Sequence, residues 1–298
     1  MRAAAANVSR GRGRLARRAV VVLLSAVALL GFSACEPRPS YVSLGDSFTA
    51  GPLIPEQRRD PAGCLRSTNN YPSLVKPDLD VPAFRDPSCS GAKTTHMKNA
   101  QDVDPGPNPP QFDKLDKNTS VVSIGIGGND IGFSSIAKDC ASLKNEGTPC
   151  QDKYVVNGVD EIARRIDETG PKVANVLQGI HNRSPNAKVF VVGYPAILPA
   201  SGPGCHPVVP VTDGDVPYLR GIQLKLNAML NAQAQSNAAT YVDTYTPSIG
   251  HDACQLPGTK WVEPPAPTSP AAPLHPNIDG MRGMARVVLA TMRANGVE

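Results

Sequence analysis

The chain has 298 residues, of which 41% are hydrophobic, enough to bury the core of one large domain or two small ones. Its formal net charge is +4, but residues 1–34 carry six arginines and no acidic residue, so the remainder carries +4 − 6 = −2. A basic surface for nucleic acid is therefore not indicated, and no nucleic-acid partner is expected.

Residues 1–34 have the composition of an export signal. Arginines precede a run of small and apolar residues from Ala19 to Leu30, and the segment closes with FSAC at 32–35. A membrane span is the alternative, but these twelve residues would rise only about 18 Å as a helix, short of the roughly 30 Å hydrocarbon layer. We therefore expect an exported protein, located outside the cell or in its envelope.

Cys35 ends a motif that resembles the lipobox of bacterial lipoproteins, although Phe32 replaces the usual leucine. Phe32 also stands close before the alternative cleavage point after Ala34, where ordinary signal peptidase requires a small residue. Lipidation of Cys35 is the favoured interpretation. The lipid would tether the protein to the outer face of the membrane.

Six further cysteines remain, an even number that suits the oxidising compartment of an exported protein. Sequence alone allows about fifteen pairings. Zinc bound by Cys205, Cys254 and the nearby His206 and His251 is an alternative, but no Cys-x-x-Cys spacing occurs and no metal is expected. Pairing of neighbours is favoured because each bridge would close one Gly/Pro-rich connection, and the expected disulfides are Cys64–Cys89, Cys140–Cys150 and Cys205–Cys254.

After the export segment, apolar runs alternate with helical patterns, which is typical of a parallel sheet flanked by helices. Helices are expected at 157–169, 215–236 and 278–294, and the first two place apolar residues on one face. The predicted fold class is a three-layer α/β/α sandwich with a central parallel sheet. The expected strands lie at 41–44, 81–84, 121–126, 188–192 and 240–242.

The Pro-rich stretch EPPAPTSPAAPLHP at 263–276 could be a linker between domains. Only one helix follows it, which is too little for a second domain. We therefore expect residues 35–298 to form a single domain.

The first expected strand ends in Gly45-Asp46-Ser47, at the edge where open α/β sheets place their ligand crevice. Gly45 would let the backbone turn sharply, and Asp46 could bond its own loop. Ser47 is then expected to face solvent with a free amide. A turn without catalytic function is the alternative, because this tripeptide arises by chance in roughly a tenth or fewer of chains of this length.

Three further motifs follow the serine in an order that matches one family. YVSLGDSFTAG at 41–51, Gly91 in CSGA, Asn129 in GIGGND and His275 in LHPN resemble the GDSL lipase/esterase group, also called SGNH hydrolases. The resemblance runs from Ser40 to near the C-terminus. It is closest to secreted, three-disulfide esterases and lipases of actinomycetes.

This resemblance implies hydrolysis of carboxylic esters through an acyl-serine intermediate, without metal or cofactor. Ser47 would be the nucleophile and His275 the general base and acid. The amides of Ser47 and Gly91 and the side chain of Asn129 would form the oxyanion hole. A lipid or small acyl ester is the expected substrate and a monomer the expected state. A carbohydrate O-acetyl esterase and an inactive envelope-binding protein remain alternatives.

The chain departs from the family pattern at one place. Most members have Asp three residues before the histidine, whereas this chain has Ala272. The relatives that it most resembles include members in which a backbone carbonyl at that place holds the imidazole, so a Ser-His dyad is expected. Asp279 is expected to be an exposed acid in the first turn of the last helix. Of the other histidines, His96 could contact substrate and His181 is expected to be a solvated cap.

Overall fold

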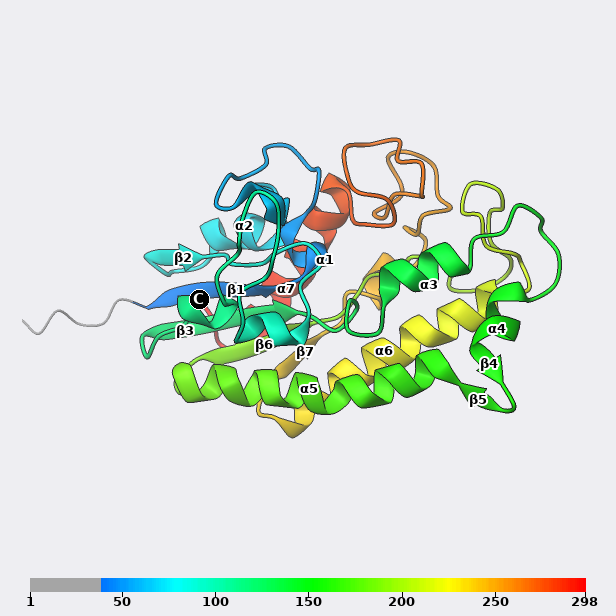
Figure 1. Cartoon of the computed structure of the whole chain (residues 1–298). Helices are drawn as coiled ribbons and strands as arrows, with labels where there is room; N and C mark the ends of the chain where they lie inside the picture. The colour runs from blue at the N-terminus through cyan, green and yellow to red at the C-terminus, as the bar shows by residue number, and fades with distance from the viewer. Residues whose placement is uncertain (1–38) are drawn as a thin grey trace, which may run out of the picture. The chain divides into compact units, whose positions relative to one another are not determined.

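A five-stranded parallel sheet forms the centre of the computed structural model, which describes residues 39–298 (Figure 1). The predicted α/β class with a central parallel sheet is confirmed. The expected export segment and Cys35 lie outside the described residues. From one edge of the sheet to the other, the strands are β2 (Ala83–Arg85), β1 (Ser40–Gly45), β3 (Thr119–Gly125), β6 (Lys188–Val192) and β7 (Thr240–Val242).

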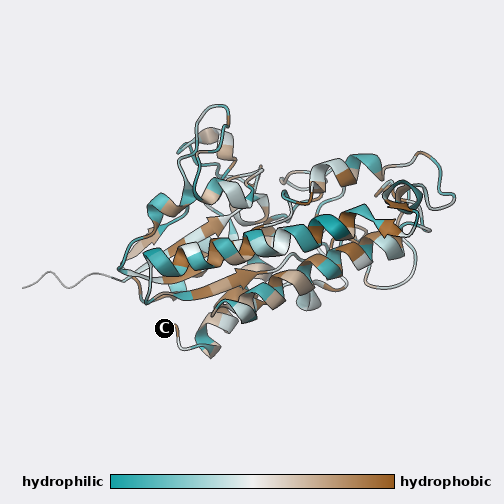
Figure 2. Ribbon diagram, turned by 60° about the horizontal axis from the view of Figure 1, so that its bottom comes forward, coloured by the Kyte–Doolittle hydropathy of each residue, from teal (hydrophilic) through white to brown (hydrophobic). Residues whose placement is uncertain are grey.

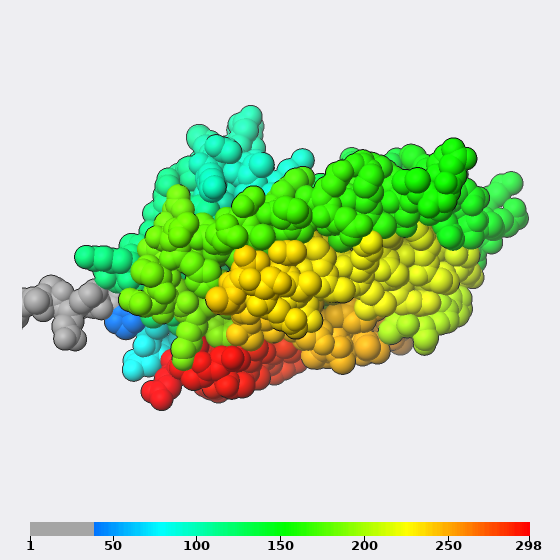
Figure 3. All heavy atoms as spheres, turned by 90° about the horizontal axis from the view of Figure 1, so that it is seen from below, coloured from blue at the N-terminus to red at the C-terminus, as the bar shows by residue number. Residues whose placement is uncertain are grey.

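Successive residues of each strand face opposite sides of the sheet, and two hydrophobic clusters result. Val42 and Val122 pack with helices α5 (Glu161–Arg183) and α6 (Val216–Ser236). On the other face, residues such as Tyr41 pack with α2 (Tyr71–Val75) and α7 (Ile278–Ala294), which gives three layers. Figure 2 shows hydrophobic residues along the strands, and Figure 3 shows α5, α6 and α7 on the surface seen from below.

All five expected strands are present. The bounds of β6 and β7 are the expected ones, whereas β1, β2 and β3 differ by one or two residues at their ends. Such differences are ordinary, because strand ends are set by the neighbouring strand rather than by the apolar run alone. Helix α7 also has its expected bounds, and α6 begins one residue later than expected.

Helix α5 begins later than the expected residue 157. A two-residue turn at Asn157 and Gly158, both with positive φ, connects the short strands β4 (Val155–Val156) and β5 (Val159–Asp160). An Asn-Gly pair favours this hairpin turn. Asp160 then caps α5, because its Oδ1 accepts a hydrogen bond of 2.9 Å from the amide of Ala163.

The same helix also extends past its expected end at residue 169. It continues through Gly170 and Pro171, although a proline inside a helix removes one N–H donor and crowds the preceding turn. Val173 and Leu177 are buried against the α6 face of the sheet, and this packing outweighs the local cost. Tertiary burial thus decides the length of α5.

Short helices and turns lie in the connections between these elements. The short α-helices are α1 (Ser47–Ala50), α3 (Phe133–Asp139) and α4 (Pro149–Tyr154). Single 3₁₀ turns occur at Ala62–Cys64, Lys76–Asp78, Thr94–Met97, Gln111–Lys114 and Thr246–Ser248.

Three disulfides join Cys64 to Cys89, Cys140 to Cys150 and Cys205 to Cys254, the pairs that neighbour pairing predicts. The third bridge occupies both thiols that zinc would have needed. Within residues 39–298, no group of three or more His, Cys, Asp or Glu side chains is placed to hold a metal ion. No helix in that same part of the chain is long and apolar enough to cross a membrane.

Candidate active site

The first part of the site is the turn that follows β1. Gly45 has φ +149°, and a Cβ there would lie 2.3 Å from Thr49 Oγ1, so no other residue fits. Asp46 caps α1 by accepting a hydrogen bond of 2.9 Å from the amide of Phe48. This cap places Ser47 as the first residue of α1.

The sequence predicts that Ser47 faces solvent, but the structure buries this residue. Only 7% of the residue is exposed, because the chain segment that carries His275 packs against the turn. The serine hydroxyl faces a cavity that both residues line. A reacting ester would therefore be largely removed from water at Ser47.

His275 lies directly beside this serine. Its Nε2 is 2.7 Å from Ser47 Oγ, and its Nδ1 is 2.7 Å from the carbonyl oxygen of Pro273. A carbonyl can only accept, so Nδ1 carries the hydrogen and Nε2 accepts from the serine hydroxyl. The neutral imidazole is thus held in the tautomer that a general base requires.

The carbonyl that orients His275 is one residue later than expected. The sequence points to Ala272, but the Ala272 carbonyl accepts a hydrogen bond of 3.2 Å from the His275 amide. Leu274 adopts φ +60°, within the turn that brings the Pro273 carbonyl to Nδ1 instead. Asp279 does not take this role, because it lies in the first turn of α7 and pairs with Arg282 at 3.2 Å.

The other expected residues lie at the point where the sheet topology reverses. Strands β1 and β3 are neighbours, and Ser47 and Asn129 follow their carboxyl ends, which is where such sheets bind ligands. Both residues line the same cavity. The Asn129 side-chain amide donates one hydrogen bond of 3.0 Å to the Ala92 carbonyl, which leaves its second N–H available.

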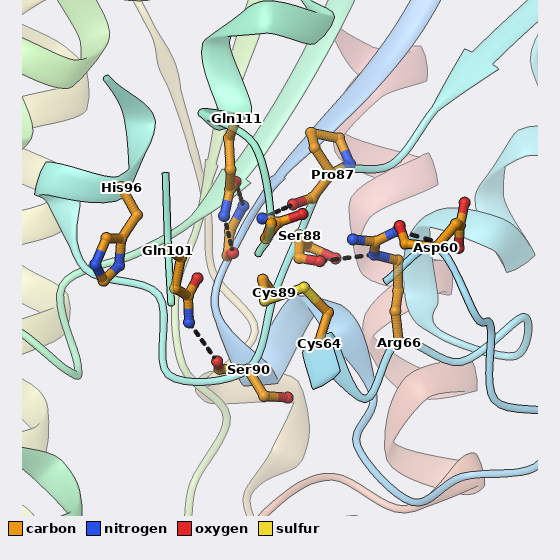
Figure 4. The surroundings of a disulfide bond; sticks show 12 residues. Asp60, Cys64, Arg66, Pro87, Ser88, Cys89, Ser90, His96, Gln101 and Gln111 are labelled. Carbon is orange, nitrogen blue, oxygen red and sulfur yellow. Dashed lines mark hydrogen bonds and ion pairs between the residues drawn. A yellow bond between two sulfur atoms is a disulfide. The ribbon is translucent and has the colours of Figure 1, made fainter. Parts of the chain in front are cut away.

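Gly91 comes two residues after Cys89, whose disulfide to Cys64 fastens this loop. Figure 4 shows the disulfide and the neighbouring Ser90. The φ of Gly91, +78°, is one that glycine adopts without strain. Gln101 fixes the loop by donating a hydrogen bond of 2.7 Å to the Ser90 carbonyl. Within residues 39–298, the backbone amides of Gly91 and Ser47 have no hydrogen-bond acceptor, so both can donate to a bound oxygen.

Two positioning residues were not predicted from the sequence. Gln111 forms two hydrogen bonds with Gly45, donating to its carbonyl at 2.9 Å and accepting from its amide at 2.8 Å. The Tyr194 hydroxyl donates to Asp46 at 2.6 Å and accepts from the Gly128 amide at 2.8 Å. Tyr194 therefore connects the serine turn to the loop that carries Asn129. Its place just after β6, at the same sheet edge, was the available sequence signal.

Burial shifts the ionisation of these groups. Removal from water raises the pKa of Asp46 to about 7, although hydrogen bonds from Tyr194 and the Phe48 amide oppose the shift. Burial also raises the pKa of Tyr194 far above its usual value, so its hydroxyl keeps its proton and donates to Asp46. For His275, loss of solvation lowers the pKa, and the hydrogen bond to Pro273 only partly reverses this.

The pH dependence of activity should reflect the lowered pKa of His275. Only the neutral imidazole can accept the serine proton, so kcat/KM for a soluble ester should rise with pH, with a midpoint below about 6.5. It should then stay high to alkaline pH. Stopped assays between pH 4 and 9 measure the pH profile of kcat/KM. Because the pKa of Asp46 is about 7, Asp46→Asn is the control that shows whether any inflection near pH 7 comes from this carboxyl. A midpoint above about 7.5 would contradict the proposed environment of His275.

The cavity has a volume of about 430 Å³, within the range that accommodates small-molecule ligands. Ser47, Asn129 and His275 are among its polar lining residues. The rest of the lining is mostly apolar, and much of it comes from α3, α6 and the chain between β6 and α6. Those apolar residues include Ile131, Phe133, Ile136, Ala137, Ala141, Ile197, Leu198, Val209, Val211, Leu219, Ile222 and Leu226.

The remaining histidines have structural contacts. His206 Nε2 lies 3.0 Å from the Ser142 carbonyl, and His251 stacks on Trp261 with ring centroids 4.7 Å apart. His181 is in the last turn of α5, but its Nε2 contacts the Asn237 carbonyl at 3.0 Å instead of ending in solvent. His96 Nδ1 accepts a hydrogen bond of 3.0 Å from the Lys93 amide and does not line the cavity.

Comparison with known proteins assigns a family to this arrangement. Residues 43–282 match the model of the GDSL-like Lipase/Acylhydrolase family. Lipase 2 of Streptomyces coelicolor is 40% identical over 258 residues, which cover 84% of each chain. The crystal structure of phospholipase A1 from Streptomyces albidoflavus superimposes with a TM-score of 0.71 and 25% identity, covering 86% of this chain and 99% of the other. The crystal structure of an extracellular lipase from Streptomyces rimosus superimposes with a TM-score of 0.70 and 26% identity, covering 85% of this chain and 99% of the lipase chain.

Proposed function

This chain belongs to the GDSL-like lipase/acylhydrolase family, and we propose that it hydrolyses carboxylic esters through an acyl-enzyme at Ser47. The observation that carries the proposal is the 2.7 Å contact between Ser47 Oγ and His275 Nε2. The backbone amides of Ser47 and Gly91 are both free to donate. A nucleophile, a base and oxyanion donors are the groups that acyl transfer needs.

In the acylation half, His275 Nε2 takes the proton as Ser47 Oγ attacks the ester carbonyl carbon. The carbonyl oxygen becomes negative and accepts hydrogen bonds from the amides of Ser47 and Gly91 and from the Asn129 side chain. When the intermediate collapses, the bond to the alcohol oxygen breaks and His275 returns its proton to the leaving alcohol. The product is an ester of Ser47.

Water completes the cycle by the same steps. His275 removes a proton from the water as its oxygen attacks the acyl carbon, and the proton then passes to Ser47 Oγ as that bond breaks. The Pro273 carbonyl keeps the imidazole aligned throughout. Because this carbonyl is neutral, it stabilises the imidazolium less than a carboxylate would, so Ser47 and His275 act as a dyad.

The apolar cavity supports acyl chains as the groups that the site prefers. A hydrocarbon chain gains about 0.8 kcal/mol for each buried CH₂, whereas a sugar would lose hydrogen bonds to water along the same walls. The lining therefore favours a lipid ester over an acetylated carbohydrate. The curated relatives described as Streptomyces lipases agree with this choice.

Export is part of the same proposal. Three disulfides are typical of proteins that fold in an oxidising compartment, and one structural neighbour is described as an extracellular lipase. We infer that residues 1–34 direct export and that Cys35 carries a lipid. We also infer that residues 35–298 act as one domain and as a monomer.

The acyl-chain proposal predicts how a bulky side chain in the cavity changes specificity. Ala137 is half-buried on α3 and lines the cavity. With Ala137→Trp, kcat/KM should fall at least about tenfold for p-nitrophenyl palmitate but less than about twofold for p-nitrophenyl acetate, because only the long chain needs the filled volume.

Ser135→Trp is the matched control, because Ser135 is exposed on the same helix and does not line the cavity. It should leave the ratio of the two rates unchanged. An equal loss for both esters in Ala137→Trp would show that the cavity does not hold the acyl chain. Acetylated xylan or glucose as the best substrate would favour the carbohydrate esterase alternative.

A further inference from the structure

Two apolar side chains are exposed at neighbouring loop tips next to the cavity. Leu143 is 99% exposed in the loop closed by the Cys140–Cys150 disulfide. Val208 is 55% exposed in the segment after Cys205. We call these two residues the tip pair. A single exposed leucine is ordinary in a soluble protein, so the tip pair matters only because of its surroundings.

Hydrogen bonds hold the two loops together. The Ser142 amide donates to the Pro210 carbonyl at 2.7 Å, and His206 Nε2 contacts the Ser142 carbonyl at 3.0 Å. Asn145 and Asp213 exchange a further pair of bonds, at 2.7 and 2.8 Å. Figure 1 shows both segments beyond the end of α3. The loops are therefore well anchored, and exposure of the tip pair is built into them.

The cavity reaches the same two loops. Ala141 is exposed and lines the cavity, as do Val209 and Pro210. Each member of the tip pair is thus within two residues of the cavity wall. An acyl chain extending from Ser47 along this wall would arrive where Leu143 and Val208 meet solvent.

Exposed charges of both signs surround the tip pair, and two of the lysines are free to contact phosphate groups. Lys138 and Lys144 are exposed and have no ion-pair partner within residues 39–298, whereas Asp139 pairs with Lys153 at 2.8 Å. Further exposed acids nearby are Glu146 and Asp213, and the Asn145 side chain donates to Asp213 at 2.8 Å. Lysines flanking an apolar tip can contact phosphate groups while the tip enters the acyl layer.

We propose that the tip pair inserts into the surface of aggregated phospholipid, so that an acyl chain passes into the cavity without crossing water. This inference rests on the proposed ester hydrolysis and adds the physical form of the substrate. Insertion would be shallow and reversible, since two apolar side chains bury far less area than an amphipathic helix.

The test measures binding to vesicles of ether-linked phosphatidylcholine, which contain no ester to hydrolyse. All proteins carry Cys35→Ser to remove the proposed lipid anchor and are isolated after export. Co-sedimentation should show binding, and Leu143→Asp should weaken partitioning at least about tenfold because it places a charge in the acyl layer. Val208→Asp should act in the same direction.

Leu224→Asp is the matched control, since Leu224 is 45% exposed on α6 and lies outside the cavity lining. It should bind as the parent does, and all variants should hydrolyse p-nitrophenyl acetate within about twofold of the parent rate. The inference is overturned if the parent does not bind, if Leu143→Asp binds equally well, or if Leu224→Asp is equally impaired.

Self-association is the competing explanation of the exposed tip pair. A parent protein that is dimeric by sedimentation velocity without lipid, and monomeric as Leu143→Asp, would show that a second copy covers the tips. If the parent protein does not hydrolyse the soluble ester, the proposed function is refuted. The vesicle experiment would still report whether the tip pair binds lipid.

Discussion

Ser47→Ala should lower kcat for p-nitrophenyl esters by a factor on the order of 10⁴ to 10⁶, because alanine has no hydroxyl to form the proposed acyl intermediate. The oxyanion donors and the cavity stay in place, so a small residual rate over water is expected. KM should change little, since the proposed binding of the acyl chain by the cavity does not need the hydroxyl. Steady-state kinetics on purified protein measures both constants.

The folded state should tolerate this substitution. Ser47 loses one hydrogen bond to His275, and the Asp46 cap and the bonds of Gly45 remain. The melting temperature should therefore change by no more than about 2 to 4 °C. Retention of a tenth of the parental kcat by well-folded protein would show that Ser47 is not the nucleophile.

Asn129→Ala should reduce kcat by about 10² to 10³, with a much smaller change in KM. The Asn129 N–H strengthens its bond as the carbonyl oxygen becomes negative, so its loss affects the transition state more than the bound substrate. This corresponds to about 2.7 to 4 kcal/mol of barrier. Comparison of kcat and KM on one ester separates this effect from weaker binding.

Asn295→Ala provides the control for losing a side-chain amide. Asn295 also donates to a backbone carbonyl, that of Thr291 at 2.8 Å, but it lies at the end of α7. Its kcat should remain within about twofold of the parent value. If Asn129→Ala instead raises KM and keeps kcat, Asn129 binds the ground state and is not an oxyanion donor.

The sheet and the positions of the proposed site residues follow from the sequence because each depends on a local signal. Strands such as β6 are uninterrupted apolar runs between turn residues, so periodicity alone marks them. Ser47 and Asn129 come directly after such strands, and parallel topology brings those ends to one edge. Gly91 is different: the family motif supplied it, and nothing in its immediate neighbours would have singled it out.

The features that the sequence did not predict depend on contacts between distant parts of the chain. Tyr194 contacts Asp46, which is 148 residues away in the sequence, and Gln111 contacts Gly45, which is 66 residues away. Local sequence patterns cannot predict contacts at such separations. Which carbonyl orients His275 depends on the positive φ of Leu274. The identity of a leucine does not predict that backbone conformation. Helix α5 continued past Pro171 because tertiary burial outweighed propensity.

Covalent trapping tests most directly whether Ser47 forms an acyl-enzyme. A p-nitrophenyl alkylphosphonate transfers its phosphorus to an activated serine with release of p-nitrophenol, and the adduct is stable to peptide mapping. We expect one adduct per chain, on the peptide containing Ser47, with none in His275→Ala, because labelling needs the base as well as the nucleophile. An adduct on another serine, or inhibition without an adduct at Ser47, would contradict an acyl-enzyme at Ser47.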